Sequence, residues 1–285
     1  MINNLCVIGV GLIGGSLALA LKKSGYVKHV TGLGRNVENL SKAKQIGIID
    51  KYETDYAKAV SHADMVFVSV PLGAMSEVFK KILPHLQSHA IVTDGGSAKH
   101  SIIDSAIDVF GYRLNQFVPG HPIAGTEKSG AEAAFDTLYQ NRRVVLTPLE
   151  ENSVDDVAKV RDMWIAAGAE VDEMGSRHHD LVLAGTSHLP HVLAFALVDC
   201  LNNLDDVDEI FKYAAGGFRD FTRIASSDPV MWRDICLHNS DAILAMMKSY
   251  QNEMDKLKLA LESSDSDALL QIFNDAKQAR DEFCM

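Results

Sequence analysis

The chain has 285 residues, of which 47% are hydrophobic and 23% charged, so it can bury the core of one large domain or two ordinary ones. This composition excludes disordered and fibrous proteins. The formal net charge of -11 opposes binding to a polyanion through bulk electrostatics, although a local basic pocket could still hold a phosphate. Nucleic acid is therefore not an expected partner.

The N-terminus and the apolar runs predict a soluble, cytoplasmic protein. The chain enters a strand-like run at 5–9 without a basic region or cleavage site, so no secretory or transit signal is expected. The apolar stretch 181–198 is interrupted by Thr186, Ser187 and two histidines, so no membrane span is predicted. Four cysteines lie apart from one another, without a CxxC pair, and are expected to be reduced and structural: Cys6, Cys200, Cys236 and Cys284.

Strand and helix patterns alternate from Met1 to about Met174. Short β-branched runs predict strands at 5–9, 29–33, 65–70, 90–94, 116–119, 143–147 and 170–173. Helical patterns lie between them at 12–24, 36–46, 73–83, 98–109 and 153–167. This alternation predicts an α/β fold with a doubly wound, mostly parallel sheet.

From Gly175 onward the strand patterns stop, and apolar residues recur at helical spacing, as at Ile243, Met246, Met247 and Tyr250. We therefore predict two domains, 1–174 and 175–285, of which the second is all-helical. The helical half either forms a self-contained bundle or buries its apolar stripe against a second copy. We favour a homodimer, because roughly 110 residues in a few long helices leave much apolar surface to cover.

The loop between the first predicted strand and helix reads G-V-G-L-I-G at 9–14. Gly9 permits a tight turn, Gly11 lets the backbone approach a pyrophosphate, and Gly14 allows close packing of helix on strand. The motif alone is common, but here it follows an apolar strand and opens an apolar helix. It predicts a Rossmann-type dinucleotide-binding domain with a cofactor site at Gly9, Gly11, Leu12, Ile13 and Gly14; the alternative is a purely structural glycine turn.

The end of the second predicted strand bears on the choice of dinucleotide. An NAD site usually places an acid there, whereas Gly34 stands in that position and Arg35 follows. Arg35 is suited to a 2′-phosphate, which favours NADP over NAD. The alternative is that Arg35 is a solvated loop residue and NAD is accepted. Val70 and Pro71, at the end of strand 65–70, are expected to flank the nicotinamide.

The segment G-H-P-I-A-G-T-E at 120–127 follows a predicted strand, so His121 should lie at the mouth of the crevice. Imidazole titrates near neutrality, which suits acceptance of a proton from a hydroxyl whose carbon loses hydride. A plain turn residue is the alternative.

Polar groups also interrupt the apolar sequence of the helical half, at 186–191 and 216–223, and buried polar groups need partners. We expect them to face a shared cavity. Arg219 and Arg223 lie four apart, so both could point to a carboxylate substrate, or one could be a surface ion-pair partner.

The histidines at 178, 179, 188 and 191 raise a metal site as an alternative. Pro190 disturbs the helical spacing between the last two, and no carboxylate or cysteine completes a familiar ligand pattern. We predict no metal.

Six motifs together resemble the prephenate and arogenate dehydrogenases of tyrosine biosynthesis over nearly the whole chain. They are VIGVGLIGGS, DGGSAK, GHPIAGTEKSG, TSHLPH, GGFRDFTRIASSDP and MWRDI. The resemblance implies hydride transfer from the ring carbon bearing the hydroxyl to NAD(P), with loss of the ring carboxylate as carbon dioxide.

The resemblance also implies roles for individual residues. His121 would polarise the substrate hydroxyl and Ser97 would support it. Ser187, His191 and Arg223 would bind substrate, with Arg223 pairing a carboxylate. Glu127 and Asp220 would form an ionic gate. Asp180 could favour the ammonium of arogenate if it faces the pocket, or it could be a solvated acid at a helix start.

Two other functions remain as alternatives. A β-hydroxyacid dehydrogenase would use a lysine early in the helical half, but no lysine occurs between Arg177 and Lys212. A noncatalytic NADP-sensing protein would have lost its chemistry, which the presence of His121, Ser97 and Arg223 disfavours.

Overall fold

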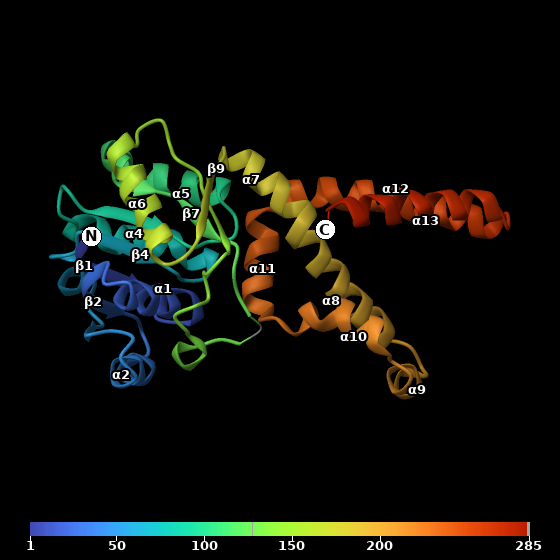
Figure 1. The fold of residues 1–285 in the computed structure, drawn as a ribbon, viewed down its shortest axis with the longest axis horizontal. Coiled ribbons are helices and arrows are strands. Elements are labelled where there is room, and N and C mark those ends of the chain that lie inside the picture. The colour runs from blue at the N-terminus through green and yellow to red at the C-terminus, as the bar shows by residue number, and fades with distance from the viewer. Residues whose placement is uncertain (127, 284–285) are drawn as a thin grey trace. The chain divides into compact units, whose positions relative to one another are not determined.

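The computed structural model describes residues 1–126 and 128–283. The chain divides into two compact units, Met1–Ser240 and Asp241–Met285. Helices α12 (Ser240–Glu262) and α13 (Ser266–Phe283), joined by a short turn, form the second unit (Figure 1). This division by compactness differs from the predicted boundary between residues 174 and 175, which stays a prediction.

The first unit is built on a six-stranded parallel sheet, which confirms the predicted α/β class. The strand order is β3-β2-β1-β4-β5-β6. The strands are β1 (Ile2–Ile8), β2 (Val27–Leu33), β3 (Lys51–Glu53), β4 (Met65–Val68), β5 (Ile91–Asp94) and β6 (Phe117–Val118). The order reverses at β1 and β4, and at this switch point doubly wound sheets bind their ligands.

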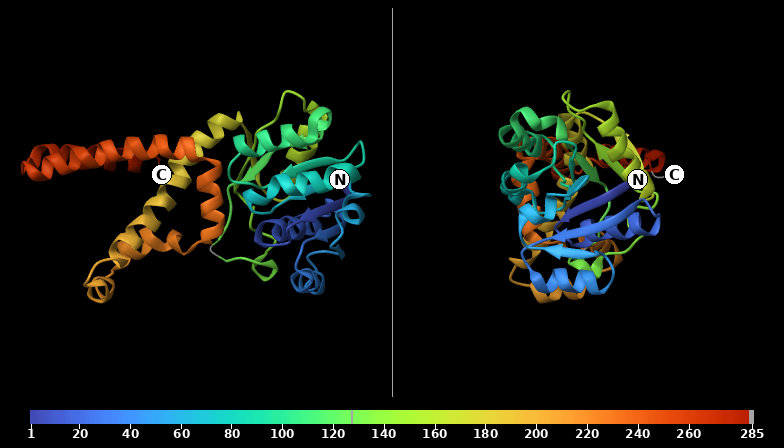
Figure 2. Two further views of the ribbon diagram at one scale, coloured as in Figure 1. Left: turned by 180° about the vertical axis from the view of Figure 1, so that it is seen from behind. Right: turned by 90° about the vertical axis from the view of Figure 1, so that its left-hand side faces the viewer.

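Helices cover both faces of the sheet, as Figures 1 and 2 show. One face packs on α1 (Leu12–Lys23), α2 (Val37–Gln45) and α6 (Val154–Ala166). The other packs on α3 (Tyr56–Val60), α4 (Met75–Ile82) and α5 (His100–Phe110). Alternate residues of β1 enter the two cores, with Leu5 on one face and Cys6 on the other. Burial of both faces explains the almost continuous apolar runs of these strands.

A second, three-stranded sheet was not expected from the sequence. It consists of β7 (Gly120–Pro122), β8 (Arg143–Leu146) and β9 (Glu170–Glu173), with β7 antiparallel and β9 parallel to β8. The Gly-His-Pro sequence of β7 has the composition of a turn, and only pairing with β8, more than twenty residues later, makes it a strand. As a result, His121 lies in a strand and not in an open loop.

After β9, residues 175–240 of the described chain contain helices and no strand, as predicted. The helices are α7 (Ser176–Leu183), α8 (Leu189–Asn202), α9 (Val207–Lys212), α10 (Gly216–Thr222) and α11 (Pro229–His238). A π-helical turn, Ala184–His188, joins α7 to α8 without a break. Pro190 has no N–H to donate to the carbonyl of Thr186, so the wider turn falls where the regular hydrogen-bond ladder is already interrupted.

The continuous helix Ser176–Asn202 is long and apolar enough to cross a membrane by length and composition alone. The sequence prediction excluded a span because of the polar residues at 186–191, and the structure places most of them in the π-helical turn or the first turn of α8. Only 28% of the apolar window is buried within the described chain. Much of the helix surface is therefore left for other contacts.

The glycine loop generates a stability prediction. Gly9 has φ +91°, and a Cβ there would lie 2.4 Å from the backbone oxygen of Ser69, whereas a Cβ on Gly11 meets nothing within 4 Å. Gly9→Ala should destabilise the protein by at least about 1–2 kcal/mol from the left-handed backbone alone. Gly11→Ala should leave the melting temperature nearly unchanged. Thermal unfolding followed by circular dichroism without dinucleotide checks this, and equal melting temperatures for the two variants would contradict it.

Candidate active site

The glycine loop lies at the carboxyl end of β1 and opens α1. Gly11 is the N-cap residue of α1, which has no side-chain cap and no acidic residue in its first turn. A Cβ on Gly14 would come within 2.4 Å of the Gly9 carbonyl oxygen, so helix and strand approach closely, while the space beside Gly11 is open. An uncapped helix N-terminus next to open space fits a pyrophosphate.

Neighbouring side chains hold this loop in place. The Ser69 hydroxyl donates to the Gly9 carbonyl at 2.7 Å, and Asn39 Nδ2 donates to the Val10 carbonyl at 3.0 Å. Val70 and Pro71 follow β4, the neighbour of β1, so the structure brings them to the same edge of the sheet. Arg35 is exposed just before α2. Leu12 is buried and Ile13 half-buried at the start of α1. Their part in cofactor binding stays a prediction.

A chain of buried side chains begins at His121 in β7. His121 is 7% exposed, and its Nδ1 lies 2.8 Å from His179 Nε2 in α7. His179 Nδ1 in turn lies 2.8 Å from Asp180 Oδ1. Sequence reasoning assigned His179 no role beyond the rejected metal cluster. The contact joins residues 58 positions apart, so no local pattern could have indicated it.

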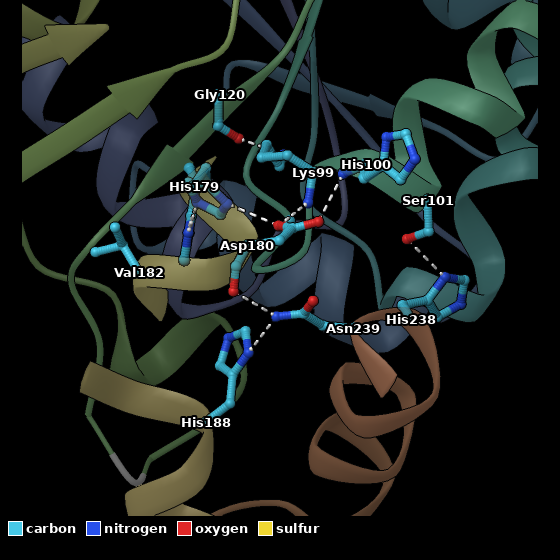
Figure 3. A network of polar contacts seen from close by, with 12 residues as sticks. Lys99, His100, Ser101, Gly120, His179, Asp180, Val182, His188, His238 and Asn239 are labelled. Carbon is cyan, nitrogen blue, oxygen red and sulfur yellow. Dashed lines mark hydrogen bonds and ion pairs between the residues drawn. The ribbon is translucent and has the colours of Figure 1, made fainter. Parts of the chain in front are cut away.

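Asp180 is buried, so the expectation of a solvated acid at a helix start is wrong, whereas a role toward the ammonium of arogenate stays a prediction. Its oxygens accept hydrogen bonds from the backbone N–H groups of Lys99 at 2.8 Å and His100 at 2.9 Å. These groups open α5, whose N-cap residue Lys99 supplies no side-chain cap. The backbone oxygen of Asp180 accepts from Asn239 Nδ2 (Figure 3). Together with His179, these donors occupy about three of the four lone-pair sites of the Asp180 carboxylate.

A buried ion pair fixes the strand that carries His121. Lys99 Nζ contacts Asp94 Oδ2 at 2.5 Å and donates to the Gly120 carbonyl at 2.7 Å. Asp94 Oδ1 accepts from the Gly120 N–H at 3.1 Å. The side chains of Lys99 and Asp94 are both completely buried. They therefore tie Gly120, and with it His121, to the end of β5.

The surroundings favour neutral imidazoles. Burial lowers the pKa of His121 well below its ordinary value, and His179, Lys99 and His188 lower it further. Burial also lowers the pKa of His179, against the opposing effect of Asp180. Burial raises the pKa of Asp180, but hydrogen bonds from His179 and from the start of α5 outweigh it and leave that pKa low. The hydrogen bonds thus run from the Asp180 carboxylate to two imidazoles, those of His179 and His121, for which the neutral form is favoured.

The predicted substrate residues gather around the π-helical turn and α11. Ser187 is half-buried, and its carbonyl lies 2.8 Å from His191 Nδ1. The His191 ring stacks on Trp232 with centroids 3.7 Å apart. Burial lowers the pKa of His191, and the charge of Arg223 lowers it further, so Arg223 lies near this imidazole.

The remaining predicted residues differ in exposure. Arg223 and Asp220 are exposed, and Ser97 is half-buried between β5 and α5. Because α10 ends at Thr222 and Arg223 begins a 3₁₀ turn, Arg219 and Arg223 do not share one regular helix as expected. Glu127 lies outside the described residues.

His188 shows that the histidine cluster is used differently from a metal site. Its Nδ1 lies 2.9 Å from Asn239 Nδ2, which leaves its proton on Nε2. Within 1–126 and 128–283, that Nε2 is buried without a hydrogen-bond partner, and no group of three or more potential ligands could hold a metal.

His188 generates a pH prediction. Burial lowers its pKa from 6.5 to about 4. The unfolded chain therefore binds this proton at higher pH than the folded chain, and stability present above pH 6.5 is lost as the pH falls toward 4. The full loss amounts to about 3 kcal/mol. His188→Asn should flatten the dependence of the urea midpoint on pH, with exposed His62→Asn as surface control. Parallel curves for wild type and His188→Asn would refute the assignment.

Comparisons with known proteins match both halves of the chain. The model of the nucleotide-binding domain of prephenate dehydrogenase matches residues 17–173, and that of the prephenate dehydrogenase dimerization domain matches residues 175–275. The cyclohexadienyl dehydrogenase of Zymomonas mobilis is 37% identical over 282 residues, covering 98% of this chain and 95% of the relative. The prephenate dehydrogenase of Bacillus subtilis is 37% identical over 284 residues, covering 99% of this chain and 76% of the relative.

Solved structures agree. The prephenate dehydrogenase of Aquifex aeolicus, in complex with hydroxyphenyl propionate and NAD+, superposes with a TM-score of 0.93 at 39% identity and 99% coverage of both chains. The arogenate dehydrogenase of Synechocystis gives a TM-score of 0.83 at 28% identity, over 98% of this chain and 99% of the other. Sequence, domain models and fold coincide along nearly the full length, and the chain belongs to the prephenate dehydrogenase family.

Proposed function

We propose that the protein catalyses the NAD(P)-dependent oxidative decarboxylation of prephenate, arogenate or both, in tyrosine biosynthesis. The observation that carries the proposal is a buried His121, whose pKa is lowered by burial and whose neighbour Gly120 is tied to the end of β5, in a domain whose glycine loop fits a dinucleotide. An imidazole in this state accepts a hydrogen bond from a hydroxyl and then its proton. The substrate class comes from the named activities of the relatives and from the resemblance of this chain to them.

The chemistry divides between the cofactor and the chain. The nicotinamide, when bound, accepts the hydride from the ring carbon that bears the hydroxyl. His121 takes the hydroxyl proton as that carbon becomes a carbonyl. The ring carboxylate then leaves as carbon dioxide, its bonding electrons make the ring aromatic, and the proton returns to the phenol oxygen. No net proton is consumed, so His121 ends neutral as it began.

The other site residues are proposed by resemblance and by their placement. Ser97, half-buried before α5, would support the hydroxyl. Ser187, His191 and Arg223 would bind the substrate, with the Arg223 guanidinium pairing a carboxylate. Asp220 and Glu127 would form an ionic gate. The cofactor would be held by Gly9, Gly11, Leu12, Ile13 and Gly14 and flanked by Val70 and Pro71. Exposed Arg35 would favour NADP over NAD.

We further propose a cytoplasmic homodimer without membrane or nucleic-acid partners, with domains at 1–174 and 175–285. The apolar surface of Ser176–Asn202 that the described chain leaves uncovered supports a second subunit as its cover. The dimerization-domain match at 175–275 points the same way. A monomeric mass by light scattering at micromolar concentration would end the dimer proposal.

The first test measures reduction of NADP and of NAD with prephenate and with arogenate, in four separate assays. Turnover in at least one is expected, with NADP preferred. His121→Asn should lower kcat by about 10²–10⁴-fold while substrate binding stays largely intact. Near-normal turnover of His121→Asn would remove its role. Silence in all four assays from wild-type protein that binds dinucleotide would favour a β-hydroxyacid substrate or the noncatalytic alternative.

Arg223 generates a separate prediction. Removing an arginine that pairs a buried substrate carboxylate should cost about 2–5 kcal/mol of binding. Arg223→Ala should therefore raise KM strongly, whereas Arg219→Ala, four residues earlier, serves as the matched control and should change KM little. An unchanged KM for Arg223→Ala, or an equal rise in both variants, would contradict the assignment.

A further inference from the structure

We propose that His179 and Asp180 are positioning residues that fix the tautomer of His121, so that His121 presents an unprotonated Nε2 to the substrate hydroxyl. The inference rests on the proposed function of His121 as proton acceptor. It gives His179 and Asp180 a role that neither the sequence nor the resemblance indicated.

The direction of each hydrogen bond follows from the donors available. An ionised carboxylate only accepts, so His179 Nδ1, 2.8 Å from Asp180 Oδ1, must carry a proton. A neutral His179 then has a bare Nε2. His121 Nδ1 lies 2.8 Å from that Nε2 and must donate to it. A neutral His121 with its proton on Nδ1 keeps a free lone pair on Nε2.

The carboxylate at the start of this chain cannot turn. Besides His179, it accepts the N–H groups of Lys99 at 2.8 Å and His100 at 2.9 Å. These donors belong to the backbone of α5, and Asn239 holds the carbonyl of the same residue (Figure 3). Backbone N–H groups can only donate, so they fix the Asp180 carboxylate as an acceptor. This sets the donor-to-acceptor direction of both hydrogen bonds from Asp180 to His121.

The other ring nitrogen of His121, Nε2, is the one left for the substrate, since Nδ1 is taken by His179. His121 as a whole is 7% exposed, and its Nε2 is not among the five side-chain atoms that are fully buried without a partner in the described residues. Besides the effect of His179 on His121, the charged and titratable groups that act on the two imidazoles are Lys99, Asp94, Asp180 and His188. Lys99, completely buried, lowers the pKa of both imidazoles, while its partner Asp94 raises the pKa of His179.

The direct test is the protonation pattern of the wild-type protein. In ¹⁵N-histidine-labelled enzyme near pH 7, with His121→Asn and His179→Gln used to assign signals, both His121 and His179 should carry their proton on Nδ1. A proton on Nε2 of His121 would overturn the proposal. This spectrum needs no substrate, so it stands apart from the activity assays: failure of all four assays would challenge the proposed function and leave the tautomer measurable.

Two substitutions test the consequence for turnover. His179→Gln keeps an oxygen that can accept from His121 Nδ1, whereas His179→Leu offers neither donor nor acceptor. The leucine variant should lose about 10²-fold or more in kcat, with KM and dinucleotide affinity changed by no more than about threefold, and glutamine should restore at least about tenfold of that loss. Exposed His178→Leu is the neighbouring control. A leucine variant with wild-type kcat, or one equal to the glutamine variant, would refute the positioning role.

Discussion

One carboxylate, that of Asp180, connects the α/β part of the chain to the helical residues beyond 175. A buried carboxylate is costly unless it accepts hydrogen bonds, and here it accepts them from two backbone N–H groups and one imidazole. The two N–H groups would otherwise be unsatisfied at the start of α5, where a side-chain cap is worth about 0.5–2 kcal/mol. The need to satisfy both partners fixes α7 against α5, and the remaining imidazole contact then follows from that geometry.

The buried charges around His121 are one cation and two carboxylates. One cation, Lys99, lies among the carboxylates of Asp94 and Asp180, and both anions oppose the effect of burial on its pKa. A buried ion pair is weak support for stability, since desolvation offsets much of the attraction. Its value here is geometric, because the pair holds Gly120 by both its N–H and its carbonyl. Because His121 follows Gly120 in the sequence, the ion pair of Lys99 and Asp94 also sets the position of the His121 imidazole.

Features that depend on residues close together in sequence were predictable, whereas features that depend on distant residues were not. The strands of the parallel sheet were predictable, because burial on both faces leaves an apolar run within four to seven residues. The short β3 and α3 were missed, since Lys51-Tyr52-Glu53 has no apolar pattern and pairs only at the sheet edge. The glycine loop was predictable because its conformational demands are local.

The polar contacts of the site lie beyond such reasoning. Asp180 meets Lys99 across 81 residues, so nothing next to Asp180 in sequence distinguishes it from a solvated acid. The resemblance indicated His121, Ser97 and Arg223 as motif residues. It did not indicate His179, which contacts the Nδ1 of His121. The adjacent pair His179-Asp180 was the available signal. His179 was considered only as part of a metal cluster that was then rejected, and Asp180 as a partner of a substrate ammonium or as a solvated acid.

The π-helical turn Ala184–His188 has a consequence for which face of the helix each residue occupies. In a regular α-helix, eight positions separate two side chains by about 80° around the axis. One extra residue absorbed in a wide turn reduces that difference to about 20°. Asp180 and His188 thereby come to the same side, where the single amide of Asn239 bonds to both. The wide turn thus corrects the helical phase. If the turn became regular α-helix at its present length, His188 and everything after it would rotate by about a quarter of a turn, whereas deleting the one extra residue would leave Asp180 and His188 on the same side.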